Sequence, residues 1–398
     1  MKRLISICVL CLLCLPALAQ DNRSSAEQAL AAVDEIILQV AKITGLKIKE
    51  PVKSAVVSRE QIRGYIQERM KQTTTPERLH AQQVALQKFG LLPAGFQLEQ
   101  FVVDLLAEQA TAYYDPRRKQ FFLSDWAPLE LQKPAIAHEL THALQDQYID
   151  LDQFLQKDGM NQDEQMARVA VVEGQGVLAM MEYMLGGRGE KTSDYPNLSE
   201  YVAQATMAET SKFPVFAAAP AYLRESLLFP YTVGLSYVKA MSVKLGKDNQ
   251  DLYAALLSRP PRSTYEVLHP GAPPLPASES GTPTVSAEAL TGFRKLDTNV
   301  LGELDLMVLF KQMLSPEEAR AVTPGWRGLK YDVFENDKGE VILAHRSVWK
   351  DAAAARAFYE SYRRIVAKKG GEAQTRSAIR DNIVDFVEGI RPAPTTAP

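Results

Sequence analysis

The sequence predicts an α+β fold in two parts: a larger, mainly helical part that carries a short β-hairpin, and a small C-terminal α+β domain. Apolar residues recur at helical spacing over most of the chain before residue 260. Residues 270–285 are rich in Pro, Ser and Gly, which predicts a linker. After it, strand-like and helix-like segments follow one another for about a hundred residues, as is typical of a separate α+β domain.

Length and composition restrict the class of protein. The chain has 398 residues, of which 46% are hydrophobic and 23% charged, and this balance excludes disordered, collagen-like and multi-span membrane proteins. A chain of this length is expected to form two or three structural units. The formal net charge of −3 is unlike the strongly basic surface that neutralises phosphates, so we expect no nucleic-acid partner.

Residues 1–19 have the pattern of a secretory signal peptide. Lys2 and Arg3 precede an apolar run over residues 4–15, and Ala17-Leu18-Ala19 has the small-x-small pattern of a cleavage site. The run is shorter than the roughly 20 residues that cross a bilayer, so an uncleaved anchor is the weaker alternative. No later stretch is apolar without interruption over that length, and we expect no stable membrane span after cleavage.

The cysteines support export. All three, at positions 8, 11 and 14, lie in the expected signal peptide, and Leu13 before Cys14 disfavours a lipoprotein signal. The mature chain would therefore reach an oxidising compartment without disulfides, which suits a domain large enough to be stabilised by its core. We expect a periplasmic or secreted protein.

Residues 20–90 are predicted to form an N-terminal helical region without catalytic residues. A helix is expected over residues 26–43, where the apolar spacing continues until Gly45. Ser58 and Gln61 have the spacing of a capping box that begins a second helix. A third helix is expected to begin at Thr75-Pro76 and to end at Gly90.

Residues 91–269 are predicted to form the central domain. A hairpin is expected over residues 111–123, with its turn at Asp115-Pro116. Pro134 suits the first turn of a helix that continues to Tyr148. The other expected helices cover residues 97–110, 168–185, 198–210, 221–229, 233–245 and 250–257.

Residues 286–391 are predicted to form the C-terminal α+β domain, and residues 392–398 a disordered tail. Two hairpins are expected, one turning at residues 336–339 and one at Asp381-Asn382. His345 alternates with apolar residues, which predicts a half-buried strand position. The expected helices cover residues 302–313, a segment beginning at Ser315, and residues 351–369.

The central domain contains the pattern of a catalytic metal site. His138-Glu139-Leu-Thr-His142 is an HExxH run inside a predicted helix. Residues four apart differ by about 40° around a helix and about 6 Å along it, so both imidazoles can bind one metal ion. Glu139 lies where it can take a proton from a water molecule that the metal activates. Imidazole and carboxylate ligands with an open position favour zinc, and we expect one Zn²⁺ per chain.

A chance match is the alternative interpretation of this run. It is disfavoured because the apolar residues at positions 136, 140 and 144 give the helix a face that can pack.

A catalytic zinc ion also needs a third protein ligand. The metzincin continuation is excluded because this chain lacks its Gly and His at the required positions. The remaining common ligand is a glutamate from a following helix, and Glu173 is the only charged residue of the apolar stretch 169–181. A buried carboxylate is unfavourable unless it is paired or bound to metal. Asp163 or Glu164 as the ligand, or a salt bridge between Glu173 and an arginine, remain alternatives.

Gly174 and Gly176 lie next to this glutamate. Each destabilises a helix by about 1 kcal/mol relative to alanine, so we expect them to let the second helix approach the zinc helix closely.

The runs HELTHALQDQ (residues 138–147) and VEGQG (residues 172–176) resemble the gluzincin type of zinc metallopeptidase, in particular a poorly characterised branch of exported bacterial proteins. The resemblance is specific from Tyr113 to Gly176 and thinner at residues 259–270 and 325–328. It implies a zincin-like metallopeptidase domain over residues 91–269. It also implies that the zinc ligands are His138, His142 and Glu173 and that the general base is Glu139.

One departure concerns the residue that orients a ligand. The thermolysin pattern has an aspartate four residues after the ligand glutamate, where this chain has Val177. Asp146, one helical turn after His142, is a candidate to orient an imidazole, or it is an ordinary surface carboxylate.

Peptide hydrolysis also needs a donor that stabilises the oxyanion. Tyr265 and His269 are candidate catalytic residues because they lie in a segment of resemblance, and Tyr231 and Tyr237 are alternatives. Tyr113 to Leu123 is either an ordinary hairpin or the edge strand along which an extended peptide binds, and the two readings are compatible.

These observations predict an exported, single-zinc metallopeptidase that acts on a peptide or protein substrate. The alternative is a non-catalytic binding module that zinc stabilises and that acts through its C-terminal domain. Glu139 disfavours this alternative because a purely structural site needs no base.

Overall fold

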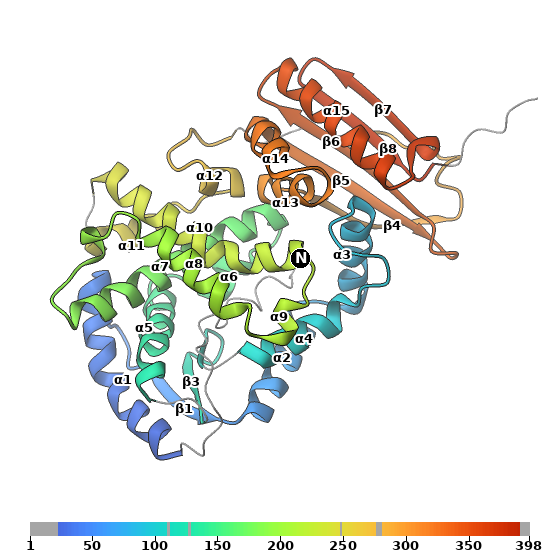
Figure 1. The fold of residues 1–398 in the computed structure, drawn as a ribbon. Coiled ribbons are helices and arrows are strands. Elements are labelled where there is room, and N and C mark those ends of the chain that lie inside the picture. The colour runs from blue at the N-terminus through green and yellow to red at the C-terminus, as the bar shows by residue number, and fades with distance from the viewer. Residues whose placement is uncertain (1–22, 110–111, 126–128, 247–248, 276–280, 391–398) are drawn as a thin grey trace, which may run out of the picture.

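The computed structural model describes residues 23–109, 112–125, 129–246, 249–275 and 281–390. The expected signal peptide (residues 1–19) and tail (residues 392–398) lie outside them. The described chain has an α+β fold with two sheets, as predicted, and the C-terminal sheet lies against the helical part (Figure 1).

The helical part contains α1 (Arg23–Thr44), β1 (Lys53–Val57), α2 (Arg59–Thr73), α3 (Pro76–Phe89), α4 (Leu98–Gln109), β2 (Ala112–Asp115), β3 (Gln120–Ser124), α5 (Leu129–Asp146), α6 (Leu151–Gln156), α7 (Gln162–Gly186), α8 (Leu198–Thr210), α9 (Pro214–Ala217), α10 (Ala221–Leu245), α11 (Asn249–Ser258) and α12 (Thr264–Leu268). The C-terminal part contains β4 (Phe293–Val300), α13 (Glu303–Met313), α14 (Pro316–Val322), β5 (Trp326–Asn336), β6 (Val341–Trp349), α15 (Ala352–Lys368), β7 (Thr375–Arg380) and β8 (Ile383–Glu388).

Local capping signals begin and end the N-terminal helices as predicted. The side chain of Ser58 accepts from the backbone of Gln61, whose side chain accepts from the backbone of Ser58, so the capping box of α2 is present. The Thr75 side chain caps α3, and this helix ends at Gly90, whose φ of 93° is a left-handed conformation that favours glycine. Residues within one or two turns therefore determine where these helices begin and end, without tertiary contacts.

The N-terminal region is not wholly helical, contrary to the prediction. β1 pairs in parallel with β3, and β2 pairs antiparallel with β3, which gives a three-stranded sheet of order β1-β3-β2. β1 is short and half-exposed, and its partner lies far along the chain. Parallel pairing of this kind depends on tertiary contacts rather than on a local turn signal, so the sequence pattern did not reveal it.

Two prolines lie inside helices. The sequence predicted that a helix begins near Pro134 and that the helical segments are interrupted at Pro230. α5 begins at Leu129 and contains Pro134, and α10 is one helix that contains Pro230. An internal proline removes a hydrogen bond and costs about 3 kcal/mol. Packing compensates in α10, where Gly234 approaches α7 so closely that a Cβ there would lie 2.3 Å from the carbonyl oxygen of Ala170.

The C-terminal sheet has the antiparallel order β4-β5-β6-β8-β7. Both predicted hairpins are present, whereas β4 was not predicted and pairs with β5. α3 from the N-terminal region lies beside β4, although more than two hundred residues separate them (Figure 1). Lys369 Nζ, at the C-terminal end of α15, donates to the Lys88 carbonyl at 2.9 Å, which ties α15 to the end of α3.

His345 is fully buried rather than half-buried as predicted. Its ring packs among Phe89, Tyr362 and Phe386, with centroid distances of 5.6, 4.8 and 5.3 Å. Burial, with a smaller effect of the Lys369 charge, lowers the pKa of His345 to about 3. The residue is therefore a neutral core histidine in the contact between α3 and the C-terminal sheet.

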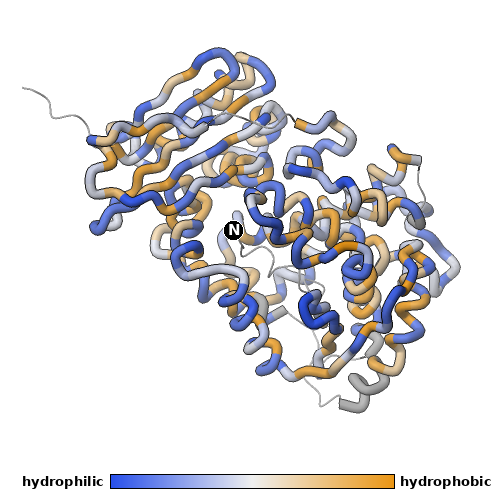
Figure 2. The backbone as a smooth tube through the Cα atoms, turned by 180° about the vertical axis from the view of Figure 1, so that it is seen from behind, coloured by the Kyte–Doolittle hydropathy of each residue, from blue (hydrophilic) through white to orange (hydrophobic). Residues whose placement is uncertain are grey.

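The distribution of apolar and hydrophilic residues along the chain agrees with this packing. Apolar segments (orange) alternate with hydrophilic segments (blue) along the helices and strands in Figure 2. Within the described ranges, no helix combines the length and the apolar character needed to cross a membrane.

Candidate metal centre

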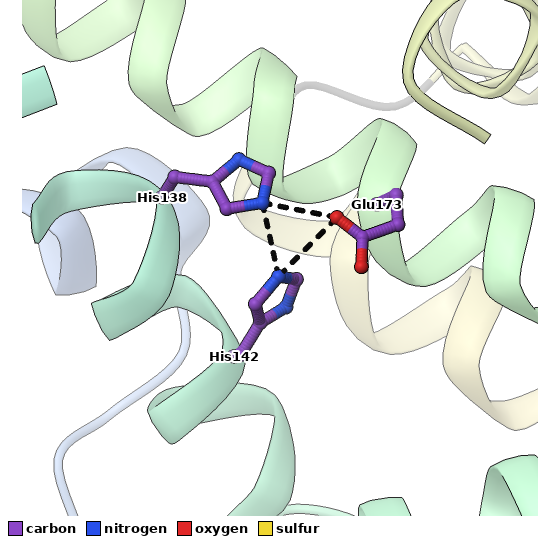
Figure 3. Close-up of side chains that lie close together, drawn as sticks. All are labelled: His138, His142 and Glu173. Atoms are coloured by element: carbon purple, nitrogen blue, oxygen red, sulfur yellow. Dashed lines mark hydrogen bonds and ion pairs between the residues drawn. The ribbon is translucent and has the colours of Figure 1, made fainter. Parts of the chain in front are cut away.

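The side chains of His138, His142 and Glu173 point toward one another between α5 and α7 (Figure 3). Both histidines lie on consecutive turns of α5, and the glutamate comes from the apolar middle of α7. Their exposed fractions are 2%, 1% and 0%. Of the three candidates for a third ligand, the structure places Glu173 beside both imidazoles.

The distances between the candidate ligand atoms fit one metal ion. His138 Nε2 lies 3.0 Å from Glu173 Oε2 and 3.0 Å from His142 Nε2, and the third separation, His142 Nε2 to Glu173 Oε2, is 3.5 Å. Ligands about 2.1 Å from a tetrahedral metal ion are separated by about 3.4 Å. Glu173 Oε1 is buried without a hydrogen-bond partner, which an ion at this centre would compensate. The residues therefore fit a single divalent cation.

The electrostatics of this group favour a cation. Burial acts to lower the pKa of His142, but the Glu173 carboxylate outweighs it and raises that pKa to about 9. Burial acts to raise the pKa of Glu173, but His142 and His138 outweigh it and lower that pKa. The raised pKa of His142 and the lowered pKa of Glu173 both indicate that the Glu173 carboxylate is ionised and stabilises positive charge beside it.

The other two candidates for the third ligand are engaged elsewhere. Asp163 accepts a hydrogen bond from the backbone of Thr264 at 3.0 Å, and Glu164 forms a salt bridge of 2.7 Å with Arg168. Glu173 forms its ion pairs with the two histidines rather than with an arginine.

The two glycines of α7 have different roles. A Cβ at Gly176 would lie 2.6 Å from Cε1 of His138, so this glycine lets α7 approach the metal-site helix as predicted. A Cβ at Gly174 would instead lie 2.4 Å from the backbone of Gly234 on α10. The prediction for Gly174 was therefore wrong, because this residue faces α10.

Replacing Gly176 by alanine is expected to lower metal affinity about 10-fold or more, because the new methyl group displaces the His138 ring. Zinc affinity measured by competition with a chelator checks this result. Gly186→Ala in the same helix is the control, since nothing lies within 4 Å of a Cβ there. Equal affinities of the two variants would contradict the prediction.

Glu139 is buried next to the ligands. Its Oε2 accepts a hydrogen bond of 2.9 Å from the backbone N–H of Tyr114 on β2. Its charge also contributes to the raised pKa of His142. β2 is an edge strand of its sheet, so the carboxylate lies between the ligand helix and a strand edge.

Gln145 contacts His142, whereas Asp146, which was a candidate for orienting an imidazole, does not. Gln145 Oε1 lies 2.8 Å from His142 Nδ1. Asp146 accepts hydrogen bonds from the Tyr114 hydroxyl and the Leu151 backbone, both at 2.9 Å. The sequence reasoning missed Gln145, although a polar residue one turn after a ligand, in a helix with an apolar face, is a usable signal.

Tyr265 and His269 lie at the junction with the C-terminal part. The Tyr265 ring packs on His269 and near Trp326, with centroid distances of 4.5 and 6.4 Å. His269 Nε2 lies 2.9 Å from Glu303 Oε2. α12 meets α7 at Asp163, which is ten residues or about 15 Å along the helix from Glu173. The structure does not bring these two candidates to the metal centre.

Tyr231, named as an alternative donor, does lie beside the centre. Its ring stacks on that of His138, with centroids 6.2 Å apart and an interplanar angle of 26°. The other alternative, Tyr237, lies six residues further along α10, and burial, with a smaller effect of the Glu266 charge, raises its pKa to about 12.

The junction contains carboxyl groups whose pKa is raised by burial. Burial and the nearby Asp163 raise the pKa of Glu303 to about 8, and burial with the Arg327 charge lowers the pKa of His269. Burial raises the pKa of Asp163 to about 7 and that of Asp305 to about 6.

Asp163→Asn is expected to stabilise the protein at alkaline pH. The raised folded-state pKa of Asp163 means that its contribution is complete below pH 4 and is lost as pH rises through about 7. The amide still accepts from Thr264 but cannot ionise, so the variant should gain about 2 kcal/mol or more over the wild type at pH 9 and little at pH 5. Urea denaturation at both pH values measures this difference.

Asp152→Asn is the control for this prediction. Burial acts to raise the pKa of Asp152, but its bonds to Arg69 and Arg117 lower it, so this variant should lose stability above pH 4. Identical pH profiles for the two variants would contradict the assignment.

Comparison with known proteins identifies only the C-terminal domain. Residues 289–391 match the model of a family described as a domain of unknown function (DUF8575). No curated protein and no solved structure matches the chain. The matched range does not include His138, His142 or Glu173.

Proposed function

We propose that this protein is an exported, zinc-dependent metallopeptidase with a zincin-like central domain, active in the periplasm or outside the cell. The observation that carries the proposal is the convergence of His138, His142 and Glu173, with the Glu139 carboxylate beside them. Two imidazoles and one carboxylate leave a position for a reactant, which is the usual composition of a hydrolytic zinc site.

The residues have separate roles in this proposal. A zinc ion held by the three ligands would supply Lewis-acid activation of a water molecule and of the scissile carbonyl. Glu139 accepts the proton of that water and passes it to the leaving amine. The Tyr114 N–H holds the Glu139 side chain in position for both transfers.

The edge of β2 suits an extended peptide. Among the residues that the structure describes, β2 has a strand partner on one side only, because it ends the order β1-β3-β2. Alternate backbone groups of an edge strand can bind an added strand, and pockets beside it then select side chains. A peptide added to β2 would bring its backbone close to Glu139.

Tyr231 is the side chain that we assign to oxyanion stabilisation, because it is the candidate donor that contacts a ligand. Tyr231→Phe should lower kcat about 100-fold with little change in KM or zinc content, since removing one donor costs about 10²–10³-fold. Tyr237→Phe in the same helix is the control. A Tyr231 variant with wild-type kcat would exclude this role.

The second candidate is a binding module that zinc stabilises. The near-complete burial of all three ligands favours it, because a structural ion would hold α5 against α7 in this way. In that case the C-terminal domain would bind the partner, and Glu139 would have no chemical role.

One experiment separates the two functions. The purified mature protein is analysed for metal and assayed against casein and a quenched-fluorescent peptide library, with and without a chelator. One zinc per chain and chelator-sensitive cleavage that zinc restores support the peptidase. Bound zinc without any cleavage supports the module, and absence of bound metal after reconstitution excludes both.

A further inference from the structure

Two buried glutamines connect His142 to α11. Gln145 lies next to His142 on α5, and its Nε2 lies 2.8 Å from Oε1 of Gln175 on α7. Gln175 Nε2 in turn donates to the backbone carbonyl of Tyr253 at 3.1 Å. Both amide side chains are 0% exposed, so solvent does not compete for these bonds.

Backbone carbonyls determine how both amides are oriented. Gln145 Nε2 also lies 3.3 Å from the carbonyl of Val172, and a carbonyl only accepts hydrogen bonds. The amino end of Gln145 must therefore face α7, which leaves its oxygen for His142. The Tyr253 carbonyl orients Gln175 in the same way, so its oxygen faces Gln145.

This orientation decides which nitrogen of His142 is free. The oxygen of Gln145 requires a hydrogen on Nδ1 of His142, at 2.8 Å. The form of the ring that binds a metal ion is neutral and carries only this one hydrogen, so the electron pair of its Nε2 faces His138 and Glu173. A metal ion can bind only the nitrogen without hydrogen.

We propose that Gln145, Gln175 and the Tyr253 carbonyl form an amide relay that positions His142 as a metal ligand, with Gln145 as the residue in contact with the ring. The inference rests on the proposed zinc site. In this inference Gln145 is a positioning residue, because it acts through His142. The relay also connects α11 to the metal centre through α7.

The two histidines are held in different ways, which makes the inference specific. No described group hydrogen-bonds to His138 Nδ1, and this ring is positioned by contact with Gly176. Loss of the relay should therefore disturb His142 alone.

The test is the zinc dissociation constant of the full mature chain, measured by competition with a fluorescent chelator. Gln145→Leu should weaken zinc binding about 10–100-fold, the usual effect of removing a partner that orients a ligand. Gln145→Glu keeps an acceptor for Nδ1–H of His142 but places an oxygen against the Val172 carbonyl, so it should lose less zinc affinity than Gln145→Leu without matching wild type. Gln175→Leu should weaken binding less than Gln145→Leu, because Gln145 keeps its bond to Val172.

Tyr362→Phe separates affinity from stability. Its buried hydroxyl donates to Glu388 Oε1 in the C-terminal sheet, away from the relay, so its loss should lower the unfolding free energy and leave zinc affinity unchanged. A double variant, Gln145→Leu with Gln175→Leu, should bind zinc no more weakly than Gln145→Leu alone.

Each result bears on the relay. Wild-type affinity in Gln145→Leu, equal losses in the Leu and Glu variants, or additive losses in the double variant would overturn it while the zinc site remains. The absorption spectrum of the Co²⁺-substituted protein gives an independent readout, since a displaced imidazole changes it in Gln145→Leu and not in Tyr362→Phe. A wild-type protein that binds no zinc overturns the relay together with the proposed function.

Discussion

Glu139→Gln is expected to lower peptide hydrolysis about 10²–10⁴-fold while the protein keeps one zinc ion per chain. The amide is the same size as the carboxylate, and its oxygen can still accept the Tyr114 N–H, so the fold should persist. It cannot accept a proton at neutral pH, and transfer to the leaving amine is lost. The measurement is kcat/KM on a quenched-fluorescent peptide, with zinc content determined on the same sample.

Asp146→Asn is the matched control for this change. It also converts a carboxylate of α5 into an amide, but Asp146 contacts the Tyr114 hydroxyl and the Leu151 backbone rather than a ligand. We expect it to keep activity within a few-fold of wild type. If Glu139→Gln cleaves peptide as fast as this control, Glu139 is not the base.

Glu173→Gln is expected to abolish the stabilisation of the protein by zinc. The wild type gains about 4 kcal/mol when free zinc exceeds the dissociation constant 1,000-fold, whereas a protein that no longer binds at this concentration gains nothing. Without zinc the variant should also be less stable than wild type at neutral pH, because it loses the buried ion pairs between Glu173 and the two histidines. Thermal unfolding with and without zinc measures both effects.

Glu164→Gln on the same helix is the control for this second change. Glu164 pairs with Arg168 and was an alternative third ligand, so the comparison also tests which carboxylate binds. Zinc should stabilise this control as strongly as wild type. A zinc-dependent shift that survives in Glu173→Gln and disappears in Glu164→Gln would reverse the assignment.

Helix ends that local chemistry decides were predictable from the sequence. The capping box of Ser58 and Gln61, and the left-handed Gly90, act within a few residues and are present as expected. Pro134 and Pro230 were misread because their local penalty was weighed without the packing that offsets it. β1 was missed because its partner strand lies far along the chain.

Some residues of the candidate metal centre could be predicted from the sequence, and others could not. The positions of His138 and His142 follow from helix geometry alone, and the isolated charge of Glu173 in an apolar helix identified it as the third member. Gln145 and Gln175 were not anticipated, because a neutral glutamine in a helix carries no strong signal of its own. Tyr265 and His269 were placed near the centre by resemblance, and the structure places them at the junction with β5 and α13.

The sequence alone determined the spacing of the two imidazoles on one face of a helix and the ends of the helices that their own side chains cap. These features depend on a periodicity of 3.6 residues and on contacts within a single turn. Only the tertiary structure decided that α7 crosses α5 at Gly176, that Gln145 rather than Asp146 faces His142, and that α12 packs against the C-terminal domain. Those outcomes depend on which helix faces meet. The faces that meet are determined by close packing of the whole core rather than by a local sequence pattern.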